Sequence, residues 1–385
     1  MRPVISREMR DINRTCILEY MRLRGKVSRT AIAKDLGLSL SSVVRITDEL
    51  MEERLICLQG EYEFSGGRRR PLIELDAQLN VVVSIVVGGQ KAMAALCSIT
   101  GQILESYVLK DHHKKGEDCV ELICSLANDM VAHAKGKIIR GISIGVPGIV
   151  LNGDKVMAAP AVGLDNICLA ERLSPYFDCP VLVENDVNLE ALGESWFGCE
   201  QNVSNLVYIH IGTLLGMGIV QDRCIFRGAH HGAGELGYLI FSRDELKREY
   251  PQYGALETRL SGYGLQSSAT RFARDGETIS PLMLFQYAQE RVPWAVELID
   301  DFQNRLAMVL VAISTLLDPE VIVLGGGVME SAKACLPEIR RMLKGKTPNP
   351  IRIERSELGK TAGILGGCAS VLHHTMSYSQ IKDMI

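Results

Sequence analysis

Apolar positions in the first part of the chain follow a helical period and then give way to strand-like stretches. Residues 11–23 place their apolar side chains on one helical face, which predicts a first helix. Ser28 is suited to cap a short second helix, and Gly37 to adopt the left-handed turn after it. Ser39 is suited to cap a third helix. The pattern therefore predicts three helices, with a tight turn between the last two.

The third predicted helix has an apolar face and a polar face. Val43, Ile46 and Leu50 recur at spacings of three and four, so we expect them to face the core. Small polar residues remain outside near the helix start, which is the part of a helix-turn-helix that enters the major groove of DNA. An arginine there can reach a guanine edge or a phosphate. The candidate DNA-binding residues are Ser41, Ser42 and Arg45. The alternative is an ordinary three-helix bundle used for protein contacts.

Residues 55–76 are predicted to form two strands joined by a loop that contains Gly66 and Gly67. Three guanidinium groups at the tip of such a hairpin repel one another unless phosphates or a narrow minor groove neutralise them. This favours a DNA-binding wing, and a solvated charged loop is the alternative. The candidate DNA-binding residues of the wing are Arg68, Arg69 and Arg70.

From residue 77 onward strand and helix patterns alternate, which is typical of an α/β fold. The stretch 301–317 predicts a long helix, which we expect inside its lobe rather than between subunits. The last of the alternating segments repeats the order of the first, so two similar halves with a cleft between them are expected. These segments are 81–104 (strand, Gly-Gly turn, strand), 118–134 (helix), 138–150 (strand and turn), 179–198 (strand ending in acids, then helix) and 205–222 (strand, turn, strand).

Composition narrows the class of protein. No apolar run in the 385 residues approaches the roughly 20 needed for a membrane span, and the N-terminal region is charged, so we expect a cytoplasmic protein without a membrane partner. Residues 1–75 contain 14 Lys and Arg against 11 Asp and Glu, and the remainder contains 28 against 35. The N-terminal part is therefore the part suited to a polyanion. Eleven cysteines without a CxxC pair predict reduced thiols and no metal site.

Six motifs together resemble the ROK family (repressors, open reading frames and kinases), in particular its transcriptional-repressor branch. The resemblance spans nearly the whole chain and implies an α/β fold with an N-terminal winged helix-turn-helix, followed by a two-lobed, actin-like and hexokinase-like domain. The motifs are SGGRRRP in the wing, IGVPG at 144–148, VENDVN at 183–188, RGAHHGAGELGY at 227–238, GALE at 254–257 and LLDPEVIVLGGGV at 316–328.

The resemblance also implies domain boundaries. Residues 1–76 are expected to form the DNA-binding domain and residues 77–385 the kinase-like domain. Within the latter, the smaller lobe is expected to span about 77–186 together with the C-terminal helix. The larger lobe is expected to span about 187–370.

By the same resemblance, Asn185 and Asp186 occupy the positions where the family grips a sugar hydroxyl, and Asp186 is at the position of the kinases' catalytic base. Glu235 and Glu257 match two further acids that contact the sugar. Tyr238 replaces a histidine that in the family binds zinc and lies beside the sugar. The alternatives are helix caps for the first pair and solvated surface acids for the two glutamates.

Several positions depart from the kinases' pattern. Val86 and Gln90 stand where kinases usually have Asp and Thr, and Leu214 interrupts a phosphate loop that is usually glycine-rich. Residues 325–327 keep the glycines that receive adenosine in the family, although a glycine run also serves simply to turn into a helix. Residues 239–256 contain no cysteine, so no zinc and no other cofactor is expected.

These observations favour a sugar-responsive, DNA-binding transcriptional regulator, expected to be a repressor, with no intact site for the phosphates of ATP and no catalytic residue in use. The expected partners are a double-stranded DNA operator, a sugar or sugar phosphate effector, and further copies of the chain in a homodimer or homotetramer. The main alternative is an ATP-dependent sugar kinase that carries a DNA-binding head. A regulator whose input is another protein is a third possibility.

Overall fold

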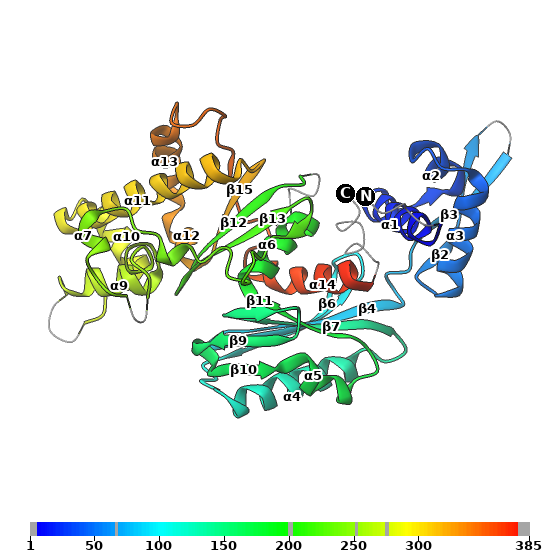
Figure 1. The fold of residues 1–385 in the computed structure, drawn as a ribbon, viewed down its shortest axis with the longest axis horizontal. Coiled ribbons are helices and arrows are strands. Elements are labelled where there is room, and N and C mark those ends of the chain that lie inside the picture. The colour runs from blue at the N-terminus through cyan, green and yellow to red at the C-terminus, as the bar shows by residue number, and fades with distance from the viewer. Residues whose placement is uncertain (1–5, 66–67, 199–202, 251–252, 274–276, 376–385) are drawn as a thin grey trace. The chain divides into compact units, whose positions relative to one another are not determined.

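A computed structural model describes residues 6–65, 68–198, 203–250, 253–273 and 277–375 (Figure 1). The chain forms two compact units. One comprises Met1–Glu184 with Gly367–Ile385, and the other comprises Asn185–Gly366. In the described parts of the chain, every helix is too short or too polar to cross a membrane.

The first unit begins with three helices and a three-stranded sheet of order β1-β3-β2. The predicted caps are confirmed, because Ser28 Oγ accepts from Ala31 N–H and Ser39 Oγ accepts from Ser42 N–H, each at 3.2 Å. Gly37 adopts the predicted left-handed conformation, with φ of 67°. The elements are α1 (Ser6–Arg24), β1 (Val27–Ser28), α2 (Arg29–Asp35), α3 (Leu40–Glu52), β2 (Ile56–Ser65) and β3 (Arg68–Leu75).

Helix α1 begins five residues before the predicted start at residue 11. Its first turn is polar and carries no apolar periodicity, but Arg10 forms an ion pair with Glu49 of α3 at 2.6 Å. The predicted packing of the three helices is confirmed, since Ile17, Ile46 and Leu50 are at most 1% exposed. The loop residues 66 and 67 lie outside the described residues.

A five-stranded sheet of order β11-β7-β4-β5-β6 follows. Strands β4 and β5 form the predicted antiparallel hairpin, and β4 pairs with β7 in parallel. A small three-stranded sheet of order β10-β9-β8 lies in the same part of the chain. The elements are β4 (Asn80–Val87), β5 (Lys91–Ser98), β6 (Ile103–Lys110), α4 (Glu117–His133), β7 (Ile138–Val146), β8 (Ile149–Leu151), β9 (Lys155–Ala159), β10 (Leu164–Cys168), α5 (Leu169–Leu173), β11 (Val181–Asn185) and α14 (Ala362–Thr375).

The second unit is built on a sheet of order β14-β13-β12-β15-β16. Strand β12 pairs with β13 antiparallel and with β15 parallel, which repeats the pairing of β4 with β5 and β7 and confirms the predicted repetition. The elements are α6 (Asp186–Phe197), β12 (Leu206–Ile211), β13 (Leu215–Gln221), β14 (Cys224–Ile225), α7 (Arg243–Leu246), α8 (Glu257–Leu260), α9 (Gly262–Thr270), α10 (Pro281–Gln289), α11 (Pro293–Leu317), β15 (Val321–Gly325), α12 (Gly327–Ser331), α13 (Leu336–Leu343) and β16 (Ile353–Arg355).

The long helix α11 packs inside the second unit, as predicted. Phe302, Leu306 and Leu310 are fully buried in its core. The helix begins at Pro293 rather than at residue 301, because proline is favoured at the first helical position. Its last turn leaves the core, and Leu316 is 81% exposed.

Helix α6 lies directly on strand β13 because two glycines of the strand lack side chains. A Cβ on Gly218 would stand 2.6 Å from both the Ala191 Cβ and the Val187 carbonyl oxygen of α6. A Cβ on Gly216 would stand 2.9 Å from Val187 Cγ2. The backbone of β13 is therefore the surface that sets the position of α6.

Gly218→Ala is expected to destabilise the protein by about 2 kcal/mol, because the added methyl must displace α6 from β13. Gly327→Ala is the matched control, since a Cβ at this helical glycine meets nothing within 4 Å. Urea denaturation of both variants measures the difference. Equal free energies of unfolding for the two variants would show that α6 can move away from β13 at no cost in stability.

Candidate functional site

Strand β11 leads directly into α6, and the junction carries the first two predicted site residues. Asn185 is the N-cap of α6, and its Oδ1 accepts from Asn188 N–H at 2.9 Å. The helix-cap alternative is therefore confirmed for Asn185, which does not prevent its amide from also facing a ligand. Asp186 is the first residue of the helix, with Oδ1 3.0 Å from Val187 N.

Asp186 belongs to a cluster with two groups that the sequence reasoning did not select. Glu190 lies one helical turn further along α6, and its Oε2 is 2.6 Å from His210 Nδ1 on β12. A histidine inside the apolar run of β12 (LVYIHI) and an acid four residues after Asp186 were the available signals. The ring of His210 lies under the β12–β13 turn, since a Cβ on Gly212 would be 2.2 Å from His210 Nε2.

Burial and neighbouring charge set the protonation of this cluster. Burial, together with the Glu190 charge, raises the pKa of Asp186 to about 6, although His210 opposes the shift. Burial alone would lower the pKa of His210, but the carboxylates of Glu190 and Asp186 outweigh it and raise this pKa to about 9. Near neutral pH the cluster therefore holds an imidazolium at His210 and a largely ionised Asp186.

The structure also brings Glu235 and Glu257 together. Desolvation raises the pKa of both carboxyls, although Glu235 is an exposed residue, and the Glu257 charge adds to the shift of Glu235. Their segments pack closely, because a Cβ on Gly254 would stand 2.1 Å from the Gly237 carbonyl oxygen. Glu257 is not the solvated acid of the alternative, since its Oε1 accepts from Leu215 N–H at 3.1 Å.

The turn between β12 and β13 is closed on itself. Gly212 N–H donates to the Leu214 carbonyl at 3.0 Å, and Leu215 N–H is held by Glu257. Its carbonyls accept from the start of α9, with Gly262 N 2.7 Å from Gly212 O. Two backbone amides of the turn are thus already used in internal hydrogen bonds, whereas the side chain of Leu214 is exposed.

The glycines after β15 serve the turn into α12. Gly326 has φ of 89°, and a Cβ there would stand 2.5 Å from the Ile211 backbone. A Cβ on Gly325 would stand 1.8 Å from the Tyr208 hydroxyl. Packing alone therefore requires glycine at both positions.

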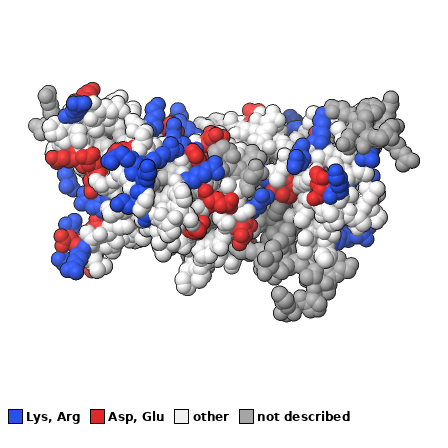
Figure 2. All heavy atoms as spheres, turned by 90° about the horizontal axis from the view of Figure 1, so that it is seen from above, with Lys and Arg blue, Asp and Glu red and all other residues white. Residues whose placement is uncertain are grey.

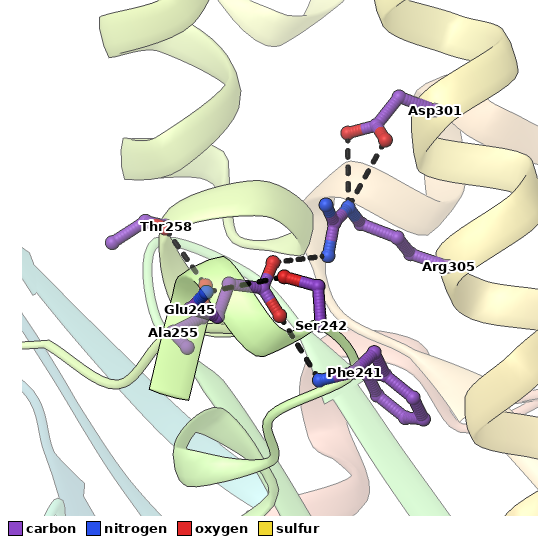
Figure 3. Close-up of polar contacts among 7 residues, drawn as sticks. All are labelled: Phe241, Ser242, Glu245, Ala255, Thr258, Asp301 and Arg305. Atoms are coloured by element: carbon purple, nitrogen blue, oxygen red, sulfur yellow. Dashed lines mark hydrogen bonds and ion pairs between the residues drawn. The ribbon is translucent and has the colours of Figure 1, made fainter. Parts of the chain in front are cut away.

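The segment between Tyr238 and Glu257 is held by an ion pair with α11 (Figure 3). The Glu245 carboxylate accepts from Phe241 N–H at 2.9 Å and from Arg305 Nη1 at 2.7 Å. Asp301 orients the same guanidinium through Arg305 Nε at 3.0 Å. Burial alone would raise the pKa of Glu245, but these donors lower it. The side chain of Tyr238 itself points to solvent, being 59% exposed.

On the first unit, the outer face of α3 places Arg45 and Ser41 in solvent, as predicted. Ser42 Oγ is tied to the cap, accepting from Ser39 Oγ at 2.8 Å. Arg70 Nη1 donates to Thr30 Oγ1 of α2 at 3.1 Å. The side chains of Arg68 and Arg69 lie outside the described residues, so their assignment to the wing stays a prediction.

The acids on the outer face of α3 follow its first two turns. Asp48 is paired with Arg29 at 2.5 Å, and Glu49 with Arg10 at 2.6 Å. Figure 2 shows basic and acidic side chains interspersed on the face that it draws. The exposed Arg45 therefore lies close to two acids that are already paired with arginines of α1 and α2.

One group of possible metal ligands occurs among the described residues. Ligand atoms of Asp154, Cys168 and Glu171 lie within 4.8 Å of one another. Asp154 Oδ1 already accepts from Glu171 N–H at 3.0 Å, so the grouping is explained by the contact between the β8–β9 turn and the start of α5.

The chain belongs to the ROK family, because the family model matches residues 82–374. It is 27% identical to a protein of Caldicellulosiruptor bescii named xylose repressor, over 97% of this chain and 98% of that one. A protein of Halalkalibacterium halodurans named glucokinase is 26% identical, over 74% of this chain and 93% of that one. A crystal structure described as a ROK family transcriptional regulator, homolog of E. coli MLC protein, superposes with a TM-score of 0.82. That match has 24% identity and covers 97% of this chain and 99% of the other. The predicted α/β, sugar-kinase-like fold is confirmed.

Asp186→Asn is expected to gain stability relative to the parent at pH 7.5 but not at pH 4. The folded pKa of about 6 exceeds the reference value of 3.8. The folded parent therefore binds the proton more tightly, and its stability falls as pH rises from 3.8 through 6. Asparagine does not titrate and therefore avoids this loss, which is on the order of 3 kcal/mol.

Urea denaturation at both pH values measures the effect, with Asp244→Asn as control because the side chain of Asp244 is 81% exposed. The same difference between Asp186→Asn and the parent at both pH values would contradict the raised pKa.

Arg305→Ala is expected to destabilise the protein by about 3 kcal/mol at pH 7, because it leaves the Glu245 carboxylate, which is only 10% exposed, without its cation. The lowered pKa of Glu245 means that this contribution is present above the ordinary pKa of 4.5 and is lost as pH falls through the folded pKa. The control is Arg341→Ala, whose guanidinium is 73% exposed beside Glu338. If Arg305→Ala and Arg341→Ala lower the stability measured by thermal or urea unfolding by the same amount, the ion pair does not hold this segment in place.

Proposed function

We propose that the protein is a sugar-responsive transcriptional repressor of the ROK family, with residues 1–76 as a winged helix-turn-helix head and residues 77–385 as the effector domain. The observation that carries the proposal is the extent of the likeness. The match to the xylose repressor includes the head and covers 97% of the chain, whereas the match to the glucokinase covers 74%. We further propose that it acts in the cytoplasm as a homodimer or homotetramer.

The geometry of the head supports DNA binding. Capped helices α2 and α3 are separated by the left-handed Gly37, and α3 presents Ser41 and Arg45 outward at its start. The antiparallel hairpin β2–β3 follows, with Arg70 held against α2. Small side chains near an exposed arginine suit the major groove, and the arginines at the hairpin tip suit phosphates or the minor groove.

The effector site is proposed to comprise Asn185, Asp186, Glu235, Tyr238 and Glu257. The junction of β11 and α6 and the Glu235–Glu257 pair supply acids and amides, which hydrogen-bond the hydroxyls of a sugar or sugar phosphate. Raised pKa values of Asp186, Glu235 and Glu257 fit such a site, because perturbed carboxyls cluster where proteins bind ligands.

The site is proposed not to handle the phosphates of ATP. Val86 on β4 offers no carboxylate for magnesium. A phosphate approaching the β12–β13 turn would meet the Glu257 carboxylate already bound to Leu215 N–H, and like charges repel. Asp186 is therefore proposed to serve binding rather than catalysis.

A sugar kinase is the second candidate, favoured by one observation. Asp186 stands at the end of a strand with a pKa of about 6, which suits a general base. A coupled assay for ATP-dependent phosphorylation across hexoses and amino sugars discriminates the two functions. Turnover that disappears in Asp186→Asn would establish the kinase and overturn the proposal above.

Substitutions in the head are expected to separate affinity from sequence preference. Replacing Arg68, Arg69 and Arg70 by alanine removes three phosphate contacts, which lowers affinity for every duplex and reduces the salt slope by about 3. Arg45→Ala changes which sequence is preferred, at a cost of about 1–3 kcal/mol on the preferred duplex.

Fluorescence anisotropy measures these affinities on duplexes that the parent selects from a random library. Arg172→Ala is the control, because that arginine pairs with Glu117 in the other part of the first unit. Parent-like binding by the triple variant would refute the wing.

A further inference from the structure

The connection between the head and the first large sheet is short and hydrogen-bonded along its whole length. Strand β3 ends at Leu75 and β4 begins at Asn80, so residues 76–79 form the entire linker. Asp76 N–H donates to the Leu55 carbonyl at 2.9 Å, and Asp76 Oδ1 accepts from Leu79 N–H at 3.0 Å. The carbonyl of Gln78 accepts from Lys137 Nζ at 2.5 Å. A linker fixed in this way acts as a joint rather than as a flexible tether.

The end of α3 is bound at this joint by side chains of the sheet. Arg140 of β7 donates from Nη2 to the Glu53 carbonyl at 2.8 Å and from Nε to Asn80 Oδ1 at 2.6 Å. Asn80 Nδ2 donates to the Arg54 carbonyl at 2.7 Å and to the Asp76 carbonyl at 2.8 Å. These two side chains hold two successive carbonyls just past the C-terminus of α3, where a cation also complements the helix dipole.

Two further features show that the joint specifies one conformation. Arg54 adopts a left-handed backbone with φ of 56°, which is unfavourable for a residue other than glycine and persists only when its surroundings hold it. Asn80 is fully buried, with its side-chain oxygen and nitrogen both bonded. The Glu53 carboxylate also binds Arg14 of α1, at 2.6 and 2.8 Å. The contacts of Arg140 therefore extend to a second helix of the head.

We propose that Arg140 and Asn80 are positioning residues for DNA reading: they fix the C-terminal end of α3 to the β4–β7 sheet and so set where the head presents the helix. The proposal rests on the proposed function of α3, and it goes beyond it by assigning a role in DNA recognition to residues outside the head. Strand β7 neighbours β11, whose last residue caps α6. The same strand thus connects the joint to the strand that leads into the proposed effector site.

Loosening the joint is expected to lower specific affinity without removing any DNA contact. A head that samples several orientations loses conformational entropy whenever it docks on its preferred sequence or shares a duplex with a second head. Non-specific binding depends on positive charge, which Arg45 and the wing arginines still supply. We therefore expect Arg140→Ala to weaken binding to the duplex selected by the parent about ten-fold, and binding to a scrambled duplex less than two-fold.

The experiment compares Arg140→Ala, Arg140→Lys and the control Arg172→Ala by anisotropy on both duplexes, with hydrogen exchange followed in peptides covering 53–58 and 76–83. Arg140→Lys keeps the charge but not the planar fork that reaches two acceptors, so an intermediate loss is expected. Exchange should accelerate in both peptides of the Arg140 variants and not in the control. If Arg140→Ala does not fold, as judged by circular dichroism, Arg140→Lys decides in its place.

The outcomes distinguish a failure of the positioning role of Arg140 from a failure of the proposed function. Parent-like affinity for the selected duplex in the folded Arg140 variants overturns the positioning role. An equal loss on the selected and scrambled duplexes also overturns it, because that pattern indicates lost charge rather than lost orientation. Failure of the parent to bind any duplex overturns the proposed function instead. In that case, hydrogen exchange that is unchanged in both peptides of the Arg140 variants would show independently that Arg140 does not fix the joint.

Discussion

The close approach of α6 to the backbone of β13 is the constraint on which the proposed effector site depends. Gly216 and Gly218 allow Val187 and Ala191 to lie against the strand with no side chain between them. Glu190, which lies between Val187 and Ala191 on the same helix, is within hydrogen-bonding distance of His210 on the neighbouring strand. A larger residue at either glycine would separate the carboxylates of α6 from the histidine of β12.

This packing also explains the charge state of the cluster. Burial raises the pKa of Asp186, a second carboxylate beside it adds to the rise, and the imidazolium of His210 limits it. A carboxyl with a pKa of about 6 can accept a hydrogen bond from a hydroxyl when ionised and donate one when protonated. Glu257 holds an amide of the β12–β13 turn, which is one of the observations behind the proposal that the site does not bind the phosphates of ATP.

The sequence predicted the parts of the molecule whose signals are local. Ser28, Ser39 and Gly37 predicted the ends of helices in the head, because caps and left-handed turns depend on a few adjacent residues. Apolar runs separated by glycine-containing turns likewise predicted the β4–β5 and β12–β13 hairpins. The polar first turn of α1 was not predicted, because the Arg10–Glu49 pair that holds it joins residues far apart in the chain.

The sequence could not predict which residues from distant parts of the chain contact one another. His210 with Glu190, Glu245 with Arg305 and Arg140 with Asn80 each join separate elements, and no spacing rule connects them. Resemblance located Asn185 and Asp186 but not their different tasks, a helix cap for one and a perturbed carboxyl for the other. The protonation of a site depends on these pairings, so it became visible only in three dimensions.

The central claim is that a sugar bound beside Asp186 governs how tightly the head holds DNA. The most direct measurement titrates D-xylose, D-glucose, N-acetylglucosamine and the 6-phosphates of the latter two into the complex of the protein with its selected duplex, followed by anisotropy. One of these compounds is expected to lower the affinity of the parent for the duplex at least ten-fold and to have no effect on Asp186→Asn. A parent whose affinity for the duplex stays the same with every compound, or a variant that responds as the parent does, would contradict the account.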